Sequence, residues 1–358
     1  MRKKLVGMLT TATLLTMALA GNVQAAEIRS VGPDGEAAVD ASTIELTDDQ
    51  IAQIKEGGYT AAICLHYGGN DWSTSQQKGL EDTFGELGIE IVAVTDANFS
   101  AETQVSNIET VMAKKPDILV SIPTDATATA DAYKQAAAAG IKIVFMDQRA
   151  NGLEAGKDYV SVVSADNYGN GYASGTVLGD ALGGKGKVAM VYYDANFAPT
   201  NQRDEGFRDA MKNYPDIEIV TEQGFTDESG CAEQGDAILT QFPNIDGIYA
   251  SWDVPMEGVL SAVRAAGMEG KVTLACNDLG NNVAREIASG NIAGGGAQMP
   301  HDQGVAEAKL AALALLGEET PSYVAVPAET VTHENVLEAY TDVYHVETPD
   351  WLKEAYVD

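Results

Sequence analysis

The sequence predicts an α/β protein made of two doubly wound parallel-sheet lobes of similar size. After residue 58, short apolar runs alternate steadily with segments of helical spacing, and several of these segments end at a glycine. The alternation restarts near residue 159, so the pattern occurs twice. Continuously apolar strands, each followed by an amphipathic helix, are typical of parallel sheets that are covered on both faces.

The first half of the pattern supplies one lobe. Its strands are expected at Thr60–Leu65, Ile89–Val94, Asp117–Ile122 and Ile141–Met146. The helices between them are expected at Ser73–Leu87, Ala101–Ala113 and Ala126–Ala139. Gly88 and Gly140 directly follow two of these helices, as is usual at a helix end. Residues 27–57 form an N-terminal extension, in which Thr47 and Gln50 predict the capping box of a short helix.

The second half repeats the pattern. Its strands are expected at Tyr159–Val163, Lys187–Tyr193, Ile217–Thr221, Gly247–Ser251, Val272–Cys276 and Ile292–Gln298. Its helices are expected at Tyr168–Leu182, Thr200–Asn213, Cys231–Gln241, Met256–Ala266, Asn282–Ser289 and Val305–Leu316. The chain is therefore divided into an N-terminal lobe, 58–164 plus 300–326, and a C-terminal lobe, 165–299 plus 327–340. Residues 341–358 are expected to form a C-terminal appendage.

The N-terminus has the pattern of an export signal. Three bases at positions 2–4 precede an apolar run from Leu5 to Ala20, and Val23 and Ala25 supply the small residues that signal peptidase requires. Residues 1–26 are therefore expected to be a signal peptide cleaved after Ala25 or Ala26, which predicts a periplasmic mature protein. A run this short and rich in threonine is a poor membrane anchor.

Charge and cysteine content narrow the class further. The chain carries a net charge of −31, and removal of three bases with the signal brings it to −34 (−31 − 3). Nucleic acid is excluded as a partner, since phosphate contacts need clustered Lys and Arg. We expect a monomer. Cys64 and Cys276 lie in apolar strand-like runs and are expected to be buried thiols. With Cys231 the count is odd, and no disulfide is predicted.

Polar and aromatic side chains gather where the predicted strands end or the next helix begins. Ligands of open α/β sheets bind beyond the carboxyl ends of the strands, so these side chains are the candidate site. The candidates are Asn70, Trp72, Asp147, Gln148, Arg203, Phe225, Trp252, Asp278 and Gln298. Carboxylates, amides and arginine suit hydroxyl groups, which both donate and accept hydrogen bonds, and aromatic rings suit the C–H face of a sugar. The set predicts a small polyhydroxylated ligand.

Ordinary structural roles compete with these assignments. Trp72 and Trp252 are also suited to a core, and Asp147 and Asp278 are also suited to cap helices. His66 follows a buried strand and is interpreted as a structural histidine.

Over residues 58–330, the chain resembles the ribose- and galactose-type periplasmic sugar-binding family. The motif positions of the family are matched by Asn70, Trp72, Asp147, Arg203 with Glu205 and Gly206-Phe207, Phe225, Asp278, and Gln298 with Pro300. The resemblance implies a type I periplasmic binding fold that closes on a sugar or sugar alcohol and delivers it to the permease of an ABC transporter. It also implies a three-segment hinge, expected near Ser164–Asn167, Gln298–Pro300 and Val326–Glu329.

The chain departs from the family pattern at several positions. Gln148 follows Asp147 where an arginine is frequent, Trp252 replaces an amide, and Ile122 stands where some members keep an asparagine. No calcium-binding loop of the galactose type is evident. Ribose or glucose specificity therefore does not carry over, and a smaller or differently shaped polyol fits the pattern equally well.

The sequence offers little for an enzyme. It has neither a Gly-x-Ser-x-Gly elbow nor a phosphate-binding loop, and its four histidines show no paired metal spacing. No catalytic residue, metal site or cofactor is therefore expected. Gly169-Asn170-Gly171 begins like a dinucleotide fingerprint, but Ser174 stands in place of the third glycine, which favours packing of this helix against its sheet. Two alternatives stay open: a non-sugar ligand (an inositol, a quorum furanone or an amino-acid-like solute), and ligand delivery to a chemoreceptor or sensor kinase.

Overall fold

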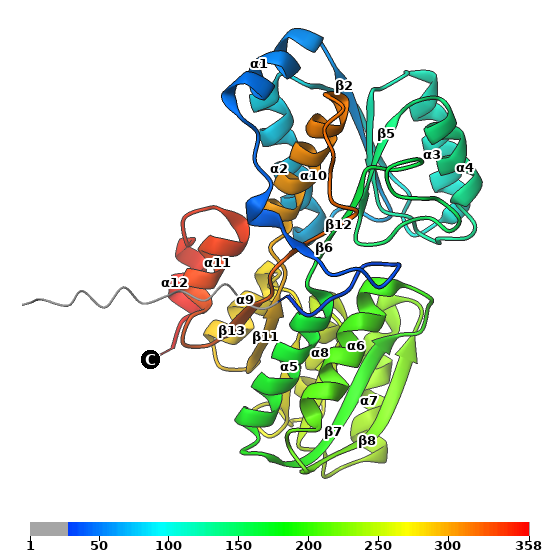
Figure 1. Ribbon diagram of the computed structural model, residues 1–358. Coiled ribbons are helices and arrows are strands. Elements are labelled where there is room, and N and C mark those ends of the chain that lie inside the picture. The colour runs from blue at the N-terminus through cyan, green and yellow to red at the C-terminus, as the bar shows by residue number, and fades with distance from the viewer. Residues whose placement is uncertain (1–27, 358) are drawn as a thin grey trace, which may run out of the picture.

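The computed structural model describes residues 28–357, which form two α/β lobes joined by several crossing segments (Figure 1). The first lobe holds a seven-stranded parallel sheet in the order β1-β12-β6-β5-β4-β2-β3. Its strands are β1 (Val39–Asp40), β2 (Thr60–Leu65), β3 (Glu90–Asp96), β4 (Ile118–Ser121), β5 (Lys142–Met146), β6 (Ser161–Ala165) and β12 (Tyr323–Val326). Its helices are α1 (Asp48–Gly57), α2 (Asp71–Leu87), α3 (Ala101–Ala113), α4 (Ala130–Ala138) and α10 (Pro300–Leu315), with a 3₁₀ turn at Ala41–Thr43.

The second lobe holds a six-stranded sheet in the order β13-β11-β10-β9-β7-β8, in which β13 is the antiparallel edge. Its strands are β7 (Lys185–Tyr193), β8 (Asp216–Phe225), β9 (Gly247–Ala250), β10 (Thr273–Cys276), β11 (Gly294–Ala297) and β13 (Glu329–Thr332). Its helices are α5 (Asn167–Ala181), α6 (Ala198–Met211), α7 (Cys231–Gln241), α8 (Asp253–Ala265), α9 (Asn281–Ala288), α11 (Val336–Tyr344) and α12 (Asp350–Ala355), with a 3₁₀ turn at Glu228–Gly230. The predicted fold class is confirmed.

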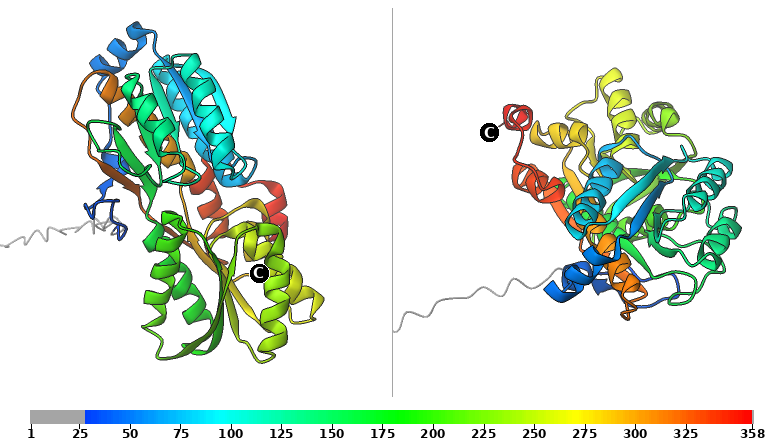
Figure 2. Two further views of the ribbon diagram at one scale, coloured as in Figure 1. Left: turned by 90° about the vertical axis from the view of Figure 1, so that its right-hand side faces the viewer. Right: turned by 90° about the horizontal axis from the view of Figure 1, so that it is seen from above.

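The chain passes between the lobes three times, because β6 leads into α5, β11 leads into α10, and β12 leads into β13. These connections lie where the sequence predicts the three hinge segments. A view turned by 90° shows the two lobes lying end to end (Figure 2). Because β6 and β12 of the first sheet and β11 of the second end where the chain crosses, the carboxyl ends of the parallel strands in both sheets face the junction. Ligands of such sheets bind at these ends.

Local sequence signals explain the helix ends. Thr47 and Gln50 form the predicted capping box of α1. The helix predicted from Ala126 begins only at Ala130, because the Asp125 carboxylate accepts hydrogen bonds from the backbone amides of residues 127 and 128 and holds a turn there. The glycine-rich α5 packs closely on α6: a Cβ at Gly171 would lie 1.8 Å from the Arg203 carbonyl oxygen. Packing against α6 therefore explains Gly171, whereas a Cβ at Gly169 would meet the carboxylate of Asp166, the N-cap of α5.

Both chain extensions belong to the lobes. In the N-terminal extension, β1 pairs with β12 and adds an edge strand that the sequence did not predict. The boundary expected at residue 340 falls inside α11. Side chains of α11 and α12, including Val343 and Leu352, are buried in the core of the second lobe. Residues 341–358 are thus packed as part of this lobe as far as the structure describes them, and they do not form a separate appendage.

Other expectations concern the termini and the thiols. The predicted signal peptide and its cleavage point lie outside the described residues. Among residues 28–357, no helix has both the length and the apolar character needed to cross a membrane. Cys64, Cys231 and Cys276 are buried free thiols, as the apolar context of the first and last predicted.

Candidate functional site: a cleft between the lobes

A cavity of about 510 Å³, partly open to solvent, lies between the lobes beside the hinge. It is lined by His66, Tyr67, Asn70, Trp72, Phe99, Ile122, Asp147, Tyr193, Phe197, Pro199, Thr200, Arg203, Trp252, Asp278 and Gln298. Both lobes and the hinge contribute, so a ligand here contacts all three.

Most of the predicted site residues line this cavity, but Gln148 and Phe225 do not. The buried Gln148 side chain donates from Nε2 to the Pro123 carbonyl (2.8 Å) and accepts at Oε1 from the Ala198 amide (3.2 Å). It thereby links the two lobes. Phe225 packs behind Tyr193 and Trp252, with ring centroids 5.7 and 5.1 Å away. It supports the aromatic wall from the core side.

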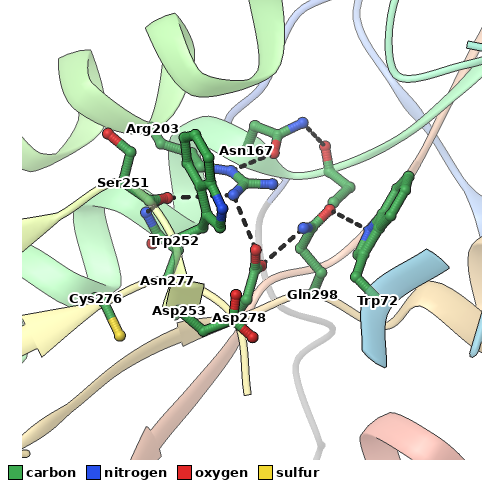
Figure 3. A network of polar contacts seen from close by, with 12 residues as sticks. Trp72, Asn167, Arg203, Ser251, Trp252, Asp253, Cys276, Asn277, Asp278 and Gln298 are labelled. Carbon is green, nitrogen blue, oxygen red and sulfur yellow. Dashed lines mark hydrogen bonds and ion pairs between the residues drawn. The ribbon is translucent and has the colours of Figure 1, made fainter. Parts of the chain in front are cut away.

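Arg203 begins a chain of polar contacts that crosses from one lobe to the other (Figure 3). Its Nη1 donates to Asp278 Oδ2 at 3.1 Å, and Asp278 Oδ1 accepts from Gln298 Nε2 at 2.7 Å. Gln298 Oε1 in turn accepts from Trp72 Nε1 at 3.2 Å. The network therefore connects α6 of the second lobe, through the hinge, to α2 of the first.

The other side of Arg203 reaches the second candidate carboxylate. Arg203 Nε donates to Asn167 Oδ1 at 2.9 Å, and Asn167 Nδ2 lies 3.5 Å from Asp147 Oδ1. The same oxygen accepts from Ser164 Oγ at 3.0 Å and from Gln303 Nε2 at 3.3 Å. Burial raises the pKa of Asp147, while the positive charge of Arg203 and these hydrogen bonds lower it. The carboxylate is therefore held in place by donors on one oxygen.

Asp147 and Asp278 share an uncommon backbone conformation. Both have positive φ, 53° and 69°, in the left-handed region that few non-glycine residues occupy. Neither caps a helix: the N-cap of α9 is Gly280, and the segment after Asp147 is not helical. The competing interpretation of these aspartates as helix caps is therefore wrong. Such strain gathers at binding sites, where it aims a side chain at a ligand.

Aromatic rings form a large part of the lining, and several of them were not predicted. Tyr67 stacks on Phe99 with a centroid distance of 4.5 Å, and Tyr193 meets Trp252 edge to face at 5.6 Å. Trp252 is fixed by a hydrogen bond from Nε1 to Glu228 Oε1 at 2.8 Å. Tyr67 follows β2 and Tyr193 ends β7, so both lie at the carboxyl end of a strand. The rule that ligands bind beyond these ends, here called the strand-end rule, would have found both residues. Phe99 lies in a loop and gave no such signal.

His66 has a different environment from the one expected of a structural histidine. Its ring lines the cavity and stacks on Phe197 of the other lobe at 5.6 Å. Its Nδ1 is buried and has no hydrogen-bond partner among the described residues. Burial lowers the pKa of His66 to about 3, so the ring is neutral near pH 7. A neutral imidazole with a free nitrogen can donate to or accept from a hydroxyl.

The lobes are in contact around the cavity. The amide and the side chain of Asn281 donate to the two carboxylate oxygens of Asp71 at 2.7 and 2.8 Å. Asp71 begins α2 and Asn281 begins α9, so these bonds join the first turns of helices from opposite lobes. Together with the link from Gln148 to Ala198, they hold a closed arrangement.

Comparison with known proteins gives a consistent assignment. Residues 61–319 match the sequence model of the periplasmic binding protein domain. The D-ribose/D-allose-binding protein of Pseudomonas aeruginosa is 29% identical over 273 residues, which cover 73% of this chain and 83% of that protein.

Two solved structures are similar along almost their whole length. A periplasmic solute-binding protein of Actinobacillus succinogenes with bound D-allose is 29% identical, with a TM-score of 0.72 over 78% of this chain and 99% of that one. A solute-binding protein of Agrobacterium vitis bound with α-D-tagatopyranose is 25% identical, with a TM-score of 0.74 over 82% of this chain and 100% of that one.

Proposed function

The chain belongs to the periplasmic binding protein domain family, and we propose that it captures a neutral monosaccharide or sugar alcohol and delivers it to the permease of an ABC importer. The similar proteins are binding proteins of sugar importers, not enzymes. One observation carries the ligand class: aspartates from both lobes and Arg203 face a cavity that also contains several aromatic rings.

The two aspartates would hold hydroxyls from opposite sides. Every protein hydrogen bond to the Asp147 carboxylate within the described residues goes to Oδ1, which leaves Oδ2 for a ligand. Asp278 and the guanidinium of Arg203 offer an acceptor and donors on the second lobe. Adjacent hydroxyls of a polyol satisfy such groups in pairs. The rings of Tyr193 and Trp252 then cover the C–H face.

The charge balance favours a neutral ligand over an anion. Arg203 is the cation of the cavity lining, and its charge is already shared with Asp278. A ligand carboxylate would therefore approach Asp147 without an unpaired cation to receive it. Like charges in a poorly hydrated site are costly, so uronic acids and ordinary amino acids are expected to bind poorly.

A thermal-shift panel on the mature protein tests the proposal. It would contain D-ribose, D-allose, D-tagatose, pentitols, hexitols and inositols, with uronic acids and amino acids as charged comparators. A ligand that binds only the folded state raises the melting temperature, so one or a few neutral polyols should do so, with calorimetry giving one site per chain. A shift produced only by a charged solute would overturn the ligand class but leave the fold intact.

A further inference from the structure

Two histidines and an aspartate meet beside the hinge, outside the ligand cavity. His301 and Asp302 lie in the first turn of α10, and His345 directly follows α11. One ligand atom from each lies within 4.8 Å of the other two. His345 Nε2 is 2.8 Å from Asp302 Oδ1, and the two imidazole centroids are 4.4 Å apart. Because the histidines are far apart in the sequence, their spacing gave no metal signal.

The two nitrogens of His301 have different surroundings. Nε2 faces Asp82 Oδ2 on α2 at 3.7 Å. Nδ1 lies 4.0 Å from Asp302 Oδ1, and it is buried without a hydrogen-bond partner among the described residues. A histidine that binds a metal through one nitrogen commonly directs the other at a carboxylate, which fixes the ring and its tautomer. The pair of Asp82 and His301 has this arrangement.

We propose that His301, Asp302 and His345 bind a divalent transition-metal ion of the Zn²⁺ class, with water completing a tetrahedral site. Two imidazoles and one carboxylate form a frequent zinc ligand set with an open fourth position. The N-terminal end of α10 repels a cation, but Asp302 supplies a ligand charge and Asp82 lies behind His301. The observed separations leave room for an ion, and small side-chain rotations would bring the ligands to bonding distance.

The backbone at His345 supports a role beyond ending a helix. His345 occupies the C-cap of α11 with φ 52°, in the left-handed conformation where glycine is usual. A helix end selected only for its cap would favour glycine there. The imidazole instead lies against His301 and Asp302.

The proposed ion would connect the two lobes. The core of α10 packs in the first lobe, whereas α11 packs in the second. In Figure 1, α11 lies beside the junction of the lobes. This inference goes beyond the proposed function and is independent of it, since none of the three residues lines the ligand cavity.

Metal titration of the untagged mature protein tests the site. We expect calorimetry to show one equivalent of Zn²⁺ bound with micromolar or tighter affinity, and Co²⁺ to show the visible absorption of a four-coordinate ion. His301→Gln and His345→Gln should each weaken Zn²⁺ binding at least tenfold, and Asp82→Asn should weaken it less because Asp82 only positions His301. His333→Gln is the matched control, since His333 contacts the Ile287 carbonyl on the second lobe, away from this cluster.

Two results would contradict the proposed metal site. The first is absence of one-to-one Zn²⁺ binding by the wild-type protein. The second is Zn²⁺ binding that survives in the His301→Gln/His345→Gln double variant, because the ion would then be bound by acidic side chains elsewhere on the surface. An equal loss in His333→Gln would also contradict it. Should one variant unfold, as circular dichroism would show, the other single variant and Asp302→Asn still decide the question. Polyol affinity in the presence of a chelator should match in all the variants, which keeps this test apart from that of the proposed function.

Discussion

Arg203 is the residue on which the charge balance of the cleft depends. Its side chain is about as buried as that of its partner, 6% and 10% exposed, so each charge relies on the other for solvation. Removing one member of a buried ion pair costs about 3–5 kcal/mol, because the remaining charge stays desolvated. The same guanidinium orients Asn167, and through it Asp147.

We expect Arg203→Ala to lower the free energy of unfolding by about 3 kcal/mol and to weaken polyol binding at least a hundredfold. Urea unfolding and calorimetry would measure the two effects. Arg208→Ala is the matched control: it lies on the same helix, and its ion pair with Glu222 is 37% exposed on both sides. Exposed pairs contribute about 0–1 kcal/mol, so this variant should bind normally. Equal effects of the two variants would refute the assigned role of Arg203.

Asp204, the neighbour of Arg203, predicts a pH dependence of stability. It is buried and accepts a hydrogen bond from Ser251 Oγ at 2.6 Å. Burial raises the pKa of Asp204 to about 7, against the lowering effects of Ser251 and of nearby arginines. The folded state therefore holds a proton that the unfolded chain releases near pH 4. This contribution to stability is complete below about pH 4 and is lost as the pH rises through about 7.

The Asp204→Asn variant carries no charge at any pH, so it should lack this loss. We expect the difference in unfolding free energy between variant and wild type to move in favour of the variant by about 2–4 kcal/mol between pH 4 and pH 8. Urea midpoints at several pH values give the difference directly, and other titrating groups, such as His66, cancel in it. If the unfolding free energies of wild type and Asp204→Asn changed in parallel with pH, the pKa of Asp204 would not be raised in the folded protein.

Residue identity at the site was predictable only in part. The strand-end rule finds side chains such as Asp147 and Asp278 because backbone topology fixes where strands end. It does not say which way a side chain turns. Gln148 immediately follows Asp147 yet does not line the cavity, because the Pro123 carbonyl of its own lobe and the Ala198 amide of the other lobe satisfy its side-chain amide. The unpartnered Nδ1 of His66 is equally invisible in sequence, since it depends on what packs around the ring.

At the scale of elements, the close contact of α5 and α6 positions the site. Gly171 lets the Arg203 backbone approach so closely that a Cβ would lie 1.8 Å from its carbonyl oxygen. Gly206 on α6 is packed as closely, and a Cβ there would lie 2.1 Å from the Tyr168 carbonyl oxygen. The sequence showed these glycines but not the contact between the two helices, because the pattern does not say which faces of the consecutive helices α5 and α6 meet.

Gly171→Ala should push α6 away from α5, lower the free energy of unfolding by about 1–3 kcal/mol and weaken polyol binding, because Arg203 moves with the helix. The matched control is Gly85→Ala in α2, where a Cβ meets nothing within 4 Å. That change should instead stabilise the protein by about 0.5–1 kcal/mol, since alanine suits a helix interior better. Thermal unfolding and calorimetry of both proteins provide the test. If Gly171→Ala changed neither the free energy of unfolding nor polyol binding, the interface between α5 and α6 would accommodate the added methyl group and this prediction would be wrong.

For the whole molecule, the fold was readable because the alternation of strands and helices is a local pattern that repeats. Helix ends marked by a cap, as at Thr47, or by glycine, as at Gly88, were also readable. The roles of the N-terminal and C-terminal extensions could not be predicted from the sequence. A two-residue strand such as β1 has no periodicity, and the burial of α11 and α12 depends on a lobe formed by distant residues.

The contacts around the cleft predict a closure equilibrium of the entire molecule. Ligand can favour the closed form only by binding it better than the open form, and the cavity is complete only when both lobes contribute. The pair of Asp71 and Asn281 stabilises the same form without lining the cavity. Asp71→Ala should therefore weaken polyol binding by about ten- to 150-fold, equivalent to about 1.5–3 kcal/mol for hydrogen bonds to a charged group. Asn282→Ala, which removes a contact to Glu257 within one lobe, should leave the polyol affinity unchanged.

Small-angle X-ray scattering should show a smaller radius of gyration with saturating polyol, and Asp71→Ala should need more ligand to reach the smaller radius. An identical scattering curve with and without bound polyol would rule out lobe closure as the binding mechanism.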